Sequence, residues 1–201
     1  KVGQISLAVT TLFWGAGATL QFIVLLWAQV HLNMTLDKAA MLQGIVAVGV
    51  IVGSIIAGKL ISLKNSIKVL PIGISMGIVV PMMTLTSTLG PASMLLIVIG
   101  ILAGSFVVPM NALLQHRGYV TLSAGQSIAV QNFNENLNVL FMLGVYSFLL
   151  YANLEVNIIV TLFGAFVAIT MFAVTIKSTR NQKKVDFATL IGDKRAATLQ
   201  K

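Results

Sequence analysis

The stretch from Val69 to His116, VLPIGISMGIVVPMMTLTSTLGPASMLLIVIGILAGSFVVPMNALLQH, decides the fold class because it contains no Asp, Glu, Lys or Arg. It is much longer than the roughly 20 apolar residues that a helix needs to cross a bilayer. The Gly90–Pro91 pair near its middle is typical of a turn, since proline cannot continue a preceding helix. We therefore expect two membrane-spanning helices here, over 67–87 and 91–115.

The composition of the whole chain leads to the same class. Hydrophobic residues make up 57% and charged residues only 9% of the chain, whereas a soluble domain carries roughly 25% charged residues. Mean hydropathy is +0.96. The sequence thus predicts an all-α polytopic membrane protein with six transmembrane helices, over 5–29, 39–60, 67–87, 91–115, 124–150 and 156–176.

The placement of basic residues predicts the orientation. Six helices put both termini on one side, and of the 13 Lys and Arg residues only Lys38 falls on the other side. Basic loops favour the cytoplasm, so we expect both termini to be cytoplasmic. The chain then divides into a six-helix bundle (1–176) and a basic cytoplasmic tail (177–201). The net charge of +8 is explained by topology, and no nucleic-acid partner is expected.

Several kinds of chemistry have no support in the sequence. There is no Cys and there are only two His residues, so we expect no disulfide, metal site or cofactor. No Ser/His/Asp constellation is recognisable, so we expect no catalytic residues and no enzymatic activity. The chain begins with Lys1 rather than Met, and we expect a fragment or a processed chain.

The fifth predicted helix carries the most unusual residues, in AVQNFNENLNVLF (129–141). At about 100° per residue, one arc gathers polar side chains that would be costly to expose to lipid. We predict that this arc lines a polar cavity; its members are Ser127, Gln131, Asn134, Glu135 and Asn138. Asn132 and Asn136 lie on a separate face, where we expect helix-to-helix hydrogen bonds.

Glu135 is the only acidic residue well inside a predicted span. It lies about 16 Å from the start of its helix, near the middle of the membrane. Such acids are candidates for function. Three roles stay open: a proton site, a partner for a cationic group, or a protonated hydrogen-bond donor. No basic residue of this chain is expected at the same depth.

A few other residues are candidates for the cavity or its mouth. Gln21 and Trp14 lie in the first predicted helix, and Asn111 lies near the end of the fourth. Arg117 follows at the start of a short predicted cytoplasmic loop, where it is either an ordinary topogenic charge or a contact for a phosphate group.

Three segments resemble the bacterial lysophospholipid transporter family of the major facilitator superfamily. They are LFWGAGATLQFIVLLW (12–27), FVVPMNALLQHRG (106–118) and SAGQSIAVQNFNENLNVLFMLGVYS (123–147). The resemblance extends from residue 12 to about 176. It implies the C-terminal six-helix half of a twelve-helix bundle, whose N-terminal half lies outside this chain.

The resemblance also implies a function. Such transporters move lysophospholipids, among them lysophosphatidylethanolamine, across the bacterial inner membrane by facilitated flipping with alternating access. Their expected partners are the lysophospholipid substrate and membrane lipids, with a functional link to an acyltransferase/acyl-carrier-protein synthetase. One departure is Gln21, where members of the family carry Arg; an amide brings no charge to a phosphate.

Three alternatives remain beside this hypothesis. The first is a major facilitator transporter of another small solute, proton-coupled through Glu135. The second is a membrane-embedded enzyme of lipid metabolism. The third is a self-contained six-helix protein that works as a dimer.

Overall fold

A computed structural model describes residues 2–121 and 124–182; side chains are described for all of these except 2–5, 117, 119–121, 124 and 181–182. These residues form α-helices with two short 3-10 segments, and the expected all-α class is confirmed. The α-helices are α1 (Val2–His31), α2 (Leu36–Leu60), α3 (Leu70–Val79), α4 (Leu89–Thr121), α5 (Ala124–Tyr151) and α6 (Val156–Gln182). The 3-10 segments are η1 (Leu63–Val69) and η2 (Val80–Leu85).

Five helical segments among the described residues are long and apolar enough to cross a membrane. They correspond to α1, α2, the combined segment Leu63–Leu85, α4 and α6. Helix α5 has 28 residues, so its length would suffice. Its polar residues between Gln131 and Asn138 lower its hydropathy, and this explains why α5 is not among the five.

Proline divides the third predicted helix into three pieces. Pro71 lies in the first turn of α3, and Pro81 lies in the first turn of η2. Each position suits proline, because the missing N–H has no partner within the first turn of a helix. Near Pro81 the chain therefore changes from α-helix to 3-10 helix. Pro109, by contrast, lies inside a continuous α4.

The prediction for the ends of the fourth helix was wrong at both boundaries. The helix begins at Leu89 rather than at Pro91, so Pro91 lies inside its first turn instead of opening it. The helix also continues to Thr121. The backbone of Arg117 is therefore helical, and the residue does not begin a loop as we had expected.

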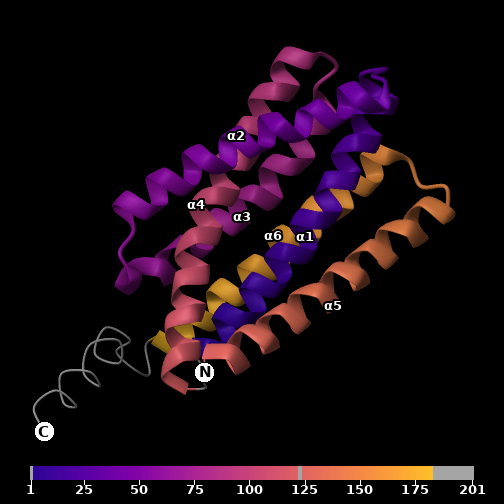
Figure 1. Cartoon of the computed structure of the whole chain (residues 1–201). Helices are drawn as coiled ribbons and strands as arrows, with labels where there is room; N and C mark the ends of the chain where they lie inside the picture. Colours follow the sequence, from indigo (N-terminus) through magenta and orange to yellow (C-terminus); the bar gives the residue numbers. More distant parts are fainter. Residues whose placement is uncertain (1, 122–123, 183–201) are drawn as a thin grey trace, which may run out of the picture.

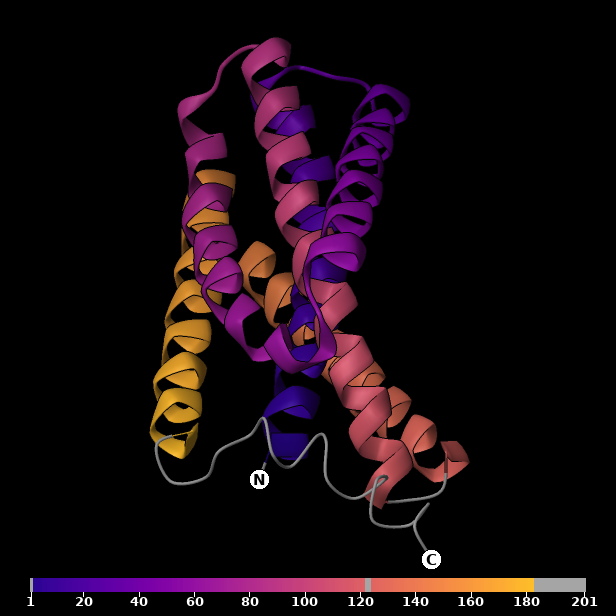
Figure 2. The same cartoon turned by 90° about the vertical axis from the view of Figure 1, so that its left-hand side faces the viewer.

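The helices pack in three main pairs: α2 with α4, α1 with α5, and α3 with α6. Figures 1 and 2 show α1 running through the bundle, with α5 along one side and the crossed helices α2 and α4 on the other. The start of α1, the end of α4, the start of α5 and the end of α6 gather at one end (Figure 1). The two ends of the described chain thus lie at the same end of the bundle, as an even number of crossings requires.

Glycine allows α2 and α4 to touch through their backbones. A Cβ at Gly49 or Gly53 of α2 would overlap a carbonyl oxygen of α4, and a Cβ at Gly100 or Gly104 of α4 would overlap one of α2. The Ser105 hydroxyl also donates to the Gly53 carbonyl at 3.2 Å. Since lipid supplies no hydrophobic force between helices, such close contact is what holds them together.

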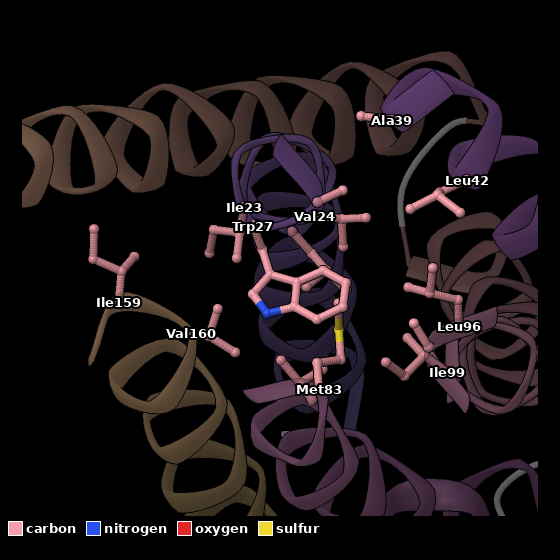
Figure 3. Packing of buried hydrophobic residues seen from close by; sticks show 14 of the residues in the cluster. Ile23, Val24, Trp27, Ala39, Leu42, Met83, Leu96, Ile99, Ile159 and Val160 are labelled. Carbon is pink, nitrogen blue, oxygen red and sulfur yellow. The ribbon is translucent and has the colours of Figure 1, made fainter. Parts of the chain in front are cut away.

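The larger of two apolar clusters is centred on Trp27, which is completely buried. Figure 3 shows its indole ring surrounded by side chains from several helices, among them Val24 of α1, Met83 of η2, Leu96 of α4 and Val160 of α6. The second cluster lies nearer the start of α1 and includes Val9, Phe106 and Met171. The two clusters connect α1 to α2, to α4, to α6 and to the segment from η1 to η2. Helix α5 takes part in them only through Tyr146 and Leu149, and it is attached chiefly to α1.

Substitution of Gly53 by Ala should destabilise the bundle by about 1–3 kcal/mol, because the added methyl group meets a backbone carbonyl that cannot rotate away. Gly44 lies in the same helix, and a Cβ there meets nothing within 4 Å. The matched Gly44→Ala variant should therefore be as stable as wild type, or slightly more stable through higher helix propensity. Thermal unfolding of the purified intact protein in detergent measures both, and equal effects would contradict the close packing of α2 on α4.

Candidate functional site

The candidate site begins with Glu135, whose side chain lies between α5 and α1. One turn earlier on α5, Gln131 Nε2 donates a hydrogen bond of 2.8 Å to Glu135 Oε1. From α1, Thr10 lies beside the Glu135 carboxyl group, and its hydroxyl donates to the backbone carbonyl oxygens of Ser6 and Leu7 at 3.1 Å. Thr10 is 1% exposed, whereas Gln131 and Glu135 are partly buried. The carboxyl group thus accepts a hydrogen bond from a neutral amide and keeps some access to the surface of the bundle.

Asn138 connects the same stripe of α5 directly to the backbone of α1. Its Nδ2 donates to the carbonyl oxygen of Thr11 at 2.8 Å. Gly15 lies one turn further along α1, and a Cβ there would overlap the Asn138 amide. The absence of a side chain at Gly15 therefore makes room for the hydrogen bond that fixes α5 against α1.

The other two members of the predicted cavity lining are placed differently. Asn134 Nδ2 donates to the Val130 carbonyl of its own helix at 2.7 Å. Ser127 packs at the contact between α4 and α5, where a Cβ at Gly118 would overlap its hydroxyl oxygen. The hydrogen bond that the Glu135 carboxyl group accepts comes from Gln131 and involves neither residue, so the group around the carboxyl is narrower than the predicted arc.

The expectation of interhelical hydrogen bonds from Asn132 and Asn136 is wrong for the helices that the structure describes. Both side chains are exposed, and Asn136 Nδ2 donates to the Asn132 carbonyl within α5 at 2.8 Å. Asn138, which we had assigned to the cavity lining, makes the interhelical bond instead. The physical reason is that α1 packs against the Asn138 face of α5 and not against the opposite one.

Trp14 and Gln21 share one face of α1 with Thr10, because they follow it by four and eleven residues. Trp14 is 44% exposed and meets Phe13 edge-on, with ring centroids 5.9 Å apart. Gln21 is exposed, and its backbone carbonyl accepts a hydrogen bond of 3.0 Å from Gln43 Nε2 of α2. These two residues extend the α1 side of the site toward the other end of the membrane.

Asn111 and Arg117 lie on α4, apart from this group. Asn111 is partly buried, and its Oδ1 has no hydrogen-bond partner among the residues that the structure describes. The side chain of Arg117 lies outside the described side chains, so its predicted contact with a phosphate stays a prediction. Within 2–121 and 124–182, no three His, Cys, Asp or Glu residues lie close enough to hold a metal ion.

Three residues of the site were not singled out from the sequence: Thr10, Thr11 and Gly15. They occupy consecutive turns of α1 and face Glu135 and Asn138. Threonine and glycine are common in packed membrane helices, so their presence alone gave no signal. Thr11 takes part through its backbone carbonyl, so no side-chain pattern in the sequence could have identified it.

Comparison with curated proteins identifies close relatives. The lysophospholipid transporter LplT of Shigella flexneri is 45% identical over 180 residues, which cover 89% of this chain and 45% of that protein. The proteins of the same name from Escherichia coli O1:K1 and Escherichia coli strain SMS-3-5 are 44% identical with the same coverage. The chain thus spans about half the length of these relatives. No family model and no solved structure matches it.

A double-mutant cycle tests the contact between α1 and α5. Gly15→Ala should destabilise the protein by about 1–3 kcal/mol through overlap with Asn138, and Asn138→Ala should cost about 1 kcal/mol through the lost hydrogen bond. The double variant should be more stable than the sum of the two costs predicts, because the overlap is relieved. Thermal unfolding of the intact protein gives the coupling; strict additivity would show that the two residues do not touch.

Proposed function

The chain is homologous to the lysophospholipid transporters over most of its length, and on that premise we propose that it forms one half of a protein that moves lysophospholipids across a membrane. The observation that carries this proposal is the identity of 44–45% over 89% of the chain. Since the chain covers only 45% of those relatives, the remaining helices of the transport path belong to the part of the protein outside it. The two halves would enclose a central cavity that opens alternately to each side.

The chemistry of the site supports a lysophospholipid as the substrate. Such a lipid has a charged headgroup and one apolar chain, so its carrier must offer polar groups next to hydrocarbon surface. Glu135 with Gln131 and Thr10 offers the polar part. A carboxylate in a medium of low dielectric attracts an ammonium group strongly, and an ethanolamine headgroup supplies one.

The distribution of charge supports an inner-membrane location with both termini in the cytoplasm. The start of α1 and the end of α6 lie at one end of the bundle (Figure 1). Lys59 lies in the last turn of α2, and Lys64 and Lys68 lie in η1, a region that the prediction places on the same side. Cytoplasmic loops are enriched in such residues.

The relatives are named as transporters, and we propose that this protein likewise moves its substrate without changing it. A lysophospholipid delivered to the cytoplasmic leaflet needs a second acyl chain before it can serve as a bilayer lipid. An acyltransferase/acyl-carrier-protein synthetase supplies that reaction and is the functional partner that we propose.

A second candidate function is proton-coupled transport of another small solute. The position of Glu135 in the membrane-spanning part of the bundle, with the neutral partners Gln131 and Thr10, favours it, because an acid in that setting can gain and lose a proton. The two functions differ in what Glu135 does: it binds a cationic headgroup in the first and carries a proton in the second.

Glu135→Gln separates the two functions in proteoliposomes that contain the intact protein. If Glu135 binds the headgroup, transport of labelled lysophosphatidylethanolamine should fall about tenfold, as expected for loss of one charge-assisted hydrogen bond. Transport of lysophosphatidylglycerol, which has no ammonium group, should fall much less. A proton carrier would instead lose pH-driven accumulation for every substrate.

Glu155→Gln is the matched control. Glu155 is exposed at the start of α6, so the same loss of a carboxylate there should leave both lipids unaffected. If wild-type protein moves no more lysophospholipid than empty liposomes do, the proposed function is wrong.

A further inference from the structure

The polar stripe of α5 continues as an apolar stripe along the same face of the helix. Glu135 and Asn138 are followed on that face by Met142, Tyr146 and Leu149, at steps of three or four residues. Such steps keep side chains on one face of an α-helix. The face that α5 turns inward is therefore polar in its first half and apolar in its second half.

A cavity of about 270 Å³ lies against the apolar half. Its walls come from three helices: Ile23 of α1, Met142, Val145 and Tyr146 of α5, and Ile159 and Phe163 of α6. Ile23 and Ile159 are each 1% exposed, so they form the floor. Phe141 and Phe166 line the cavity and are 63% and 44% exposed, so the cavity opens sideways between α5 and α6.

The polar atoms in the wall are satisfied within the protein. The Thr19 hydroxyl donates to the Gly15 carbonyl at 2.9 Å, and the Tyr146 hydroxyl donates to the Phe22 carbonyl at 3.5 Å. Neither hydroxyl needs a polar ligand. The cavity therefore presents hydrocarbon surface, which favours an apolar occupant.

We propose that this cavity binds the acyl chain of the lysophospholipid whose headgroup meets Glu135, an inference that rests on the proposed function. The order of the α5 stripe matches a single-chain amphiphile: at the helical rise, Glu135 precedes Met142 by about 10 Å and Leu149 by about 21 Å. The charge of the carboxylate complements an ammonium headgroup. The volume falls just below the roughly 300–1,000 Å³ of sites for whole small molecules, which suits part of a lipid such as a single acyl chain.

The proposal also fixes the direction of the bound lipid. The polar half of the stripe lies nearer the start of α5, which is predicted to be cytoplasmic. The headgroup therefore lies toward the cytoplasm and the chain toward the opposite face, which is the sense in which a lipid sits in the cytoplasmic leaflet. The cavity lies beside the second half of α5 and the first half of α6, so its sideways opening faces the hydrocarbon in the half of the membrane away from the cytoplasm.

Val145→Trp tests the cavity in proteoliposomes of the intact protein. The indole ring would fill space at the mouth and displace about two methylene groups of the chain, so the KM for palmitoyl lysophosphatidylethanolamine should rise about tenfold. The KM for the hexanoyl lipid, whose chain is too short to fill the cavity, should stay near that of wild type. Leu140→Trp is the matched control, since Leu140 is exposed on α5 and does not line the cavity; it should change neither KM.

Each other result overturns the proposal. An unchanged KM for the palmitoyl lipid in Val145→Trp would show that its chain binds elsewhere. An equal rise in KM for both lipids would show that the substitution acts independently of the length of the acyl chain, and this too would contradict binding of the chain in the cavity. If wild-type protein moves neither lipid, the proposed function itself is wrong. That failure is seen in the wild-type protein alone, whereas failure of the present proposal is seen in the comparison of Val145→Trp with wild type.

Photolabelling gives a second readout that does not depend on transport. A lysophosphatidylethanolamine with a diazirine at the end of its acyl chain should label the segment 142–149 of the intact wild-type protein, and unlabelled lysophosphatidylethanolamine should compete. Label that is displaced only by a two-chain phospholipid would identify a membrane lipid as the occupant and overturn the proposal, as would the absence of label in this segment.

Discussion

Hydrocarbon offers no hydrogen-bond partners, so a polar side chain that a membrane helix turns inward must be paired within the protein. Helix α5 satisfies this constraint at two levels: Gln131 pairs with Glu135 on the same helix, and Asn138 bonds to the backbone of α1. The second bond fixes which face of α5 meets α1. The apolar residues further along that face are thereby directed toward α1 and α6, where the cavity lies. The position of the candidate binding surfaces thus depends on the bond from Asn138 to Thr11, on the glycine that makes room for it, and on a second α5–α1 bond from Tyr146 to Phe22.

The rest of the bundle is held by backbone contact. Besides the α2–α4 contact through four glycines, Gly77 of α3 packs on Ala168 of α6, and Gly164 of α6 packs on Pro81. Contacts of this kind cannot adjust by a change of rotamer, so the paired helices behave as rigid units. The proposed alternating access needs rigid halves that rock against each other. Helix α5, which is attached chiefly to α1, is the element whose packing depends most on specific polar groups.

Much of the fold could be predicted because the bilayer imposes it. Long uncharged runs have to be helical in lipid, and this made the all-α class and the helix count accessible without coordinates. The resemblance to the lysophospholipid transporters, read from three segments, is confirmed by 44–45% identity to proteins of that name. The errors concern local boundaries. Proline is tolerated anywhere in the first turn of a helix, so Pro91 did not fix the residue at which α4 begins. The apolar pattern gave no sign that α4 continues past Gln115 to Thr121.

The candidate site, like the fold, combines features that the sequence predicts with features that only the structure reveals. The sequence by itself determined that α5 is amphipathic, that Glu135 lies well inside it, and that its asparagines fall on two faces, because these properties follow from helical periodicity alone. Only the tertiary structure decided that the Asn138 face meets α1, that Thr10, Thr11 and Gly15 are its neighbours, and that a cavity follows along the same stripe. The physical reason is that periodicity sorts side chains around one helix axis, whereas the choice of neighbour depends on the close fit between two helices that are far apart in the sequence.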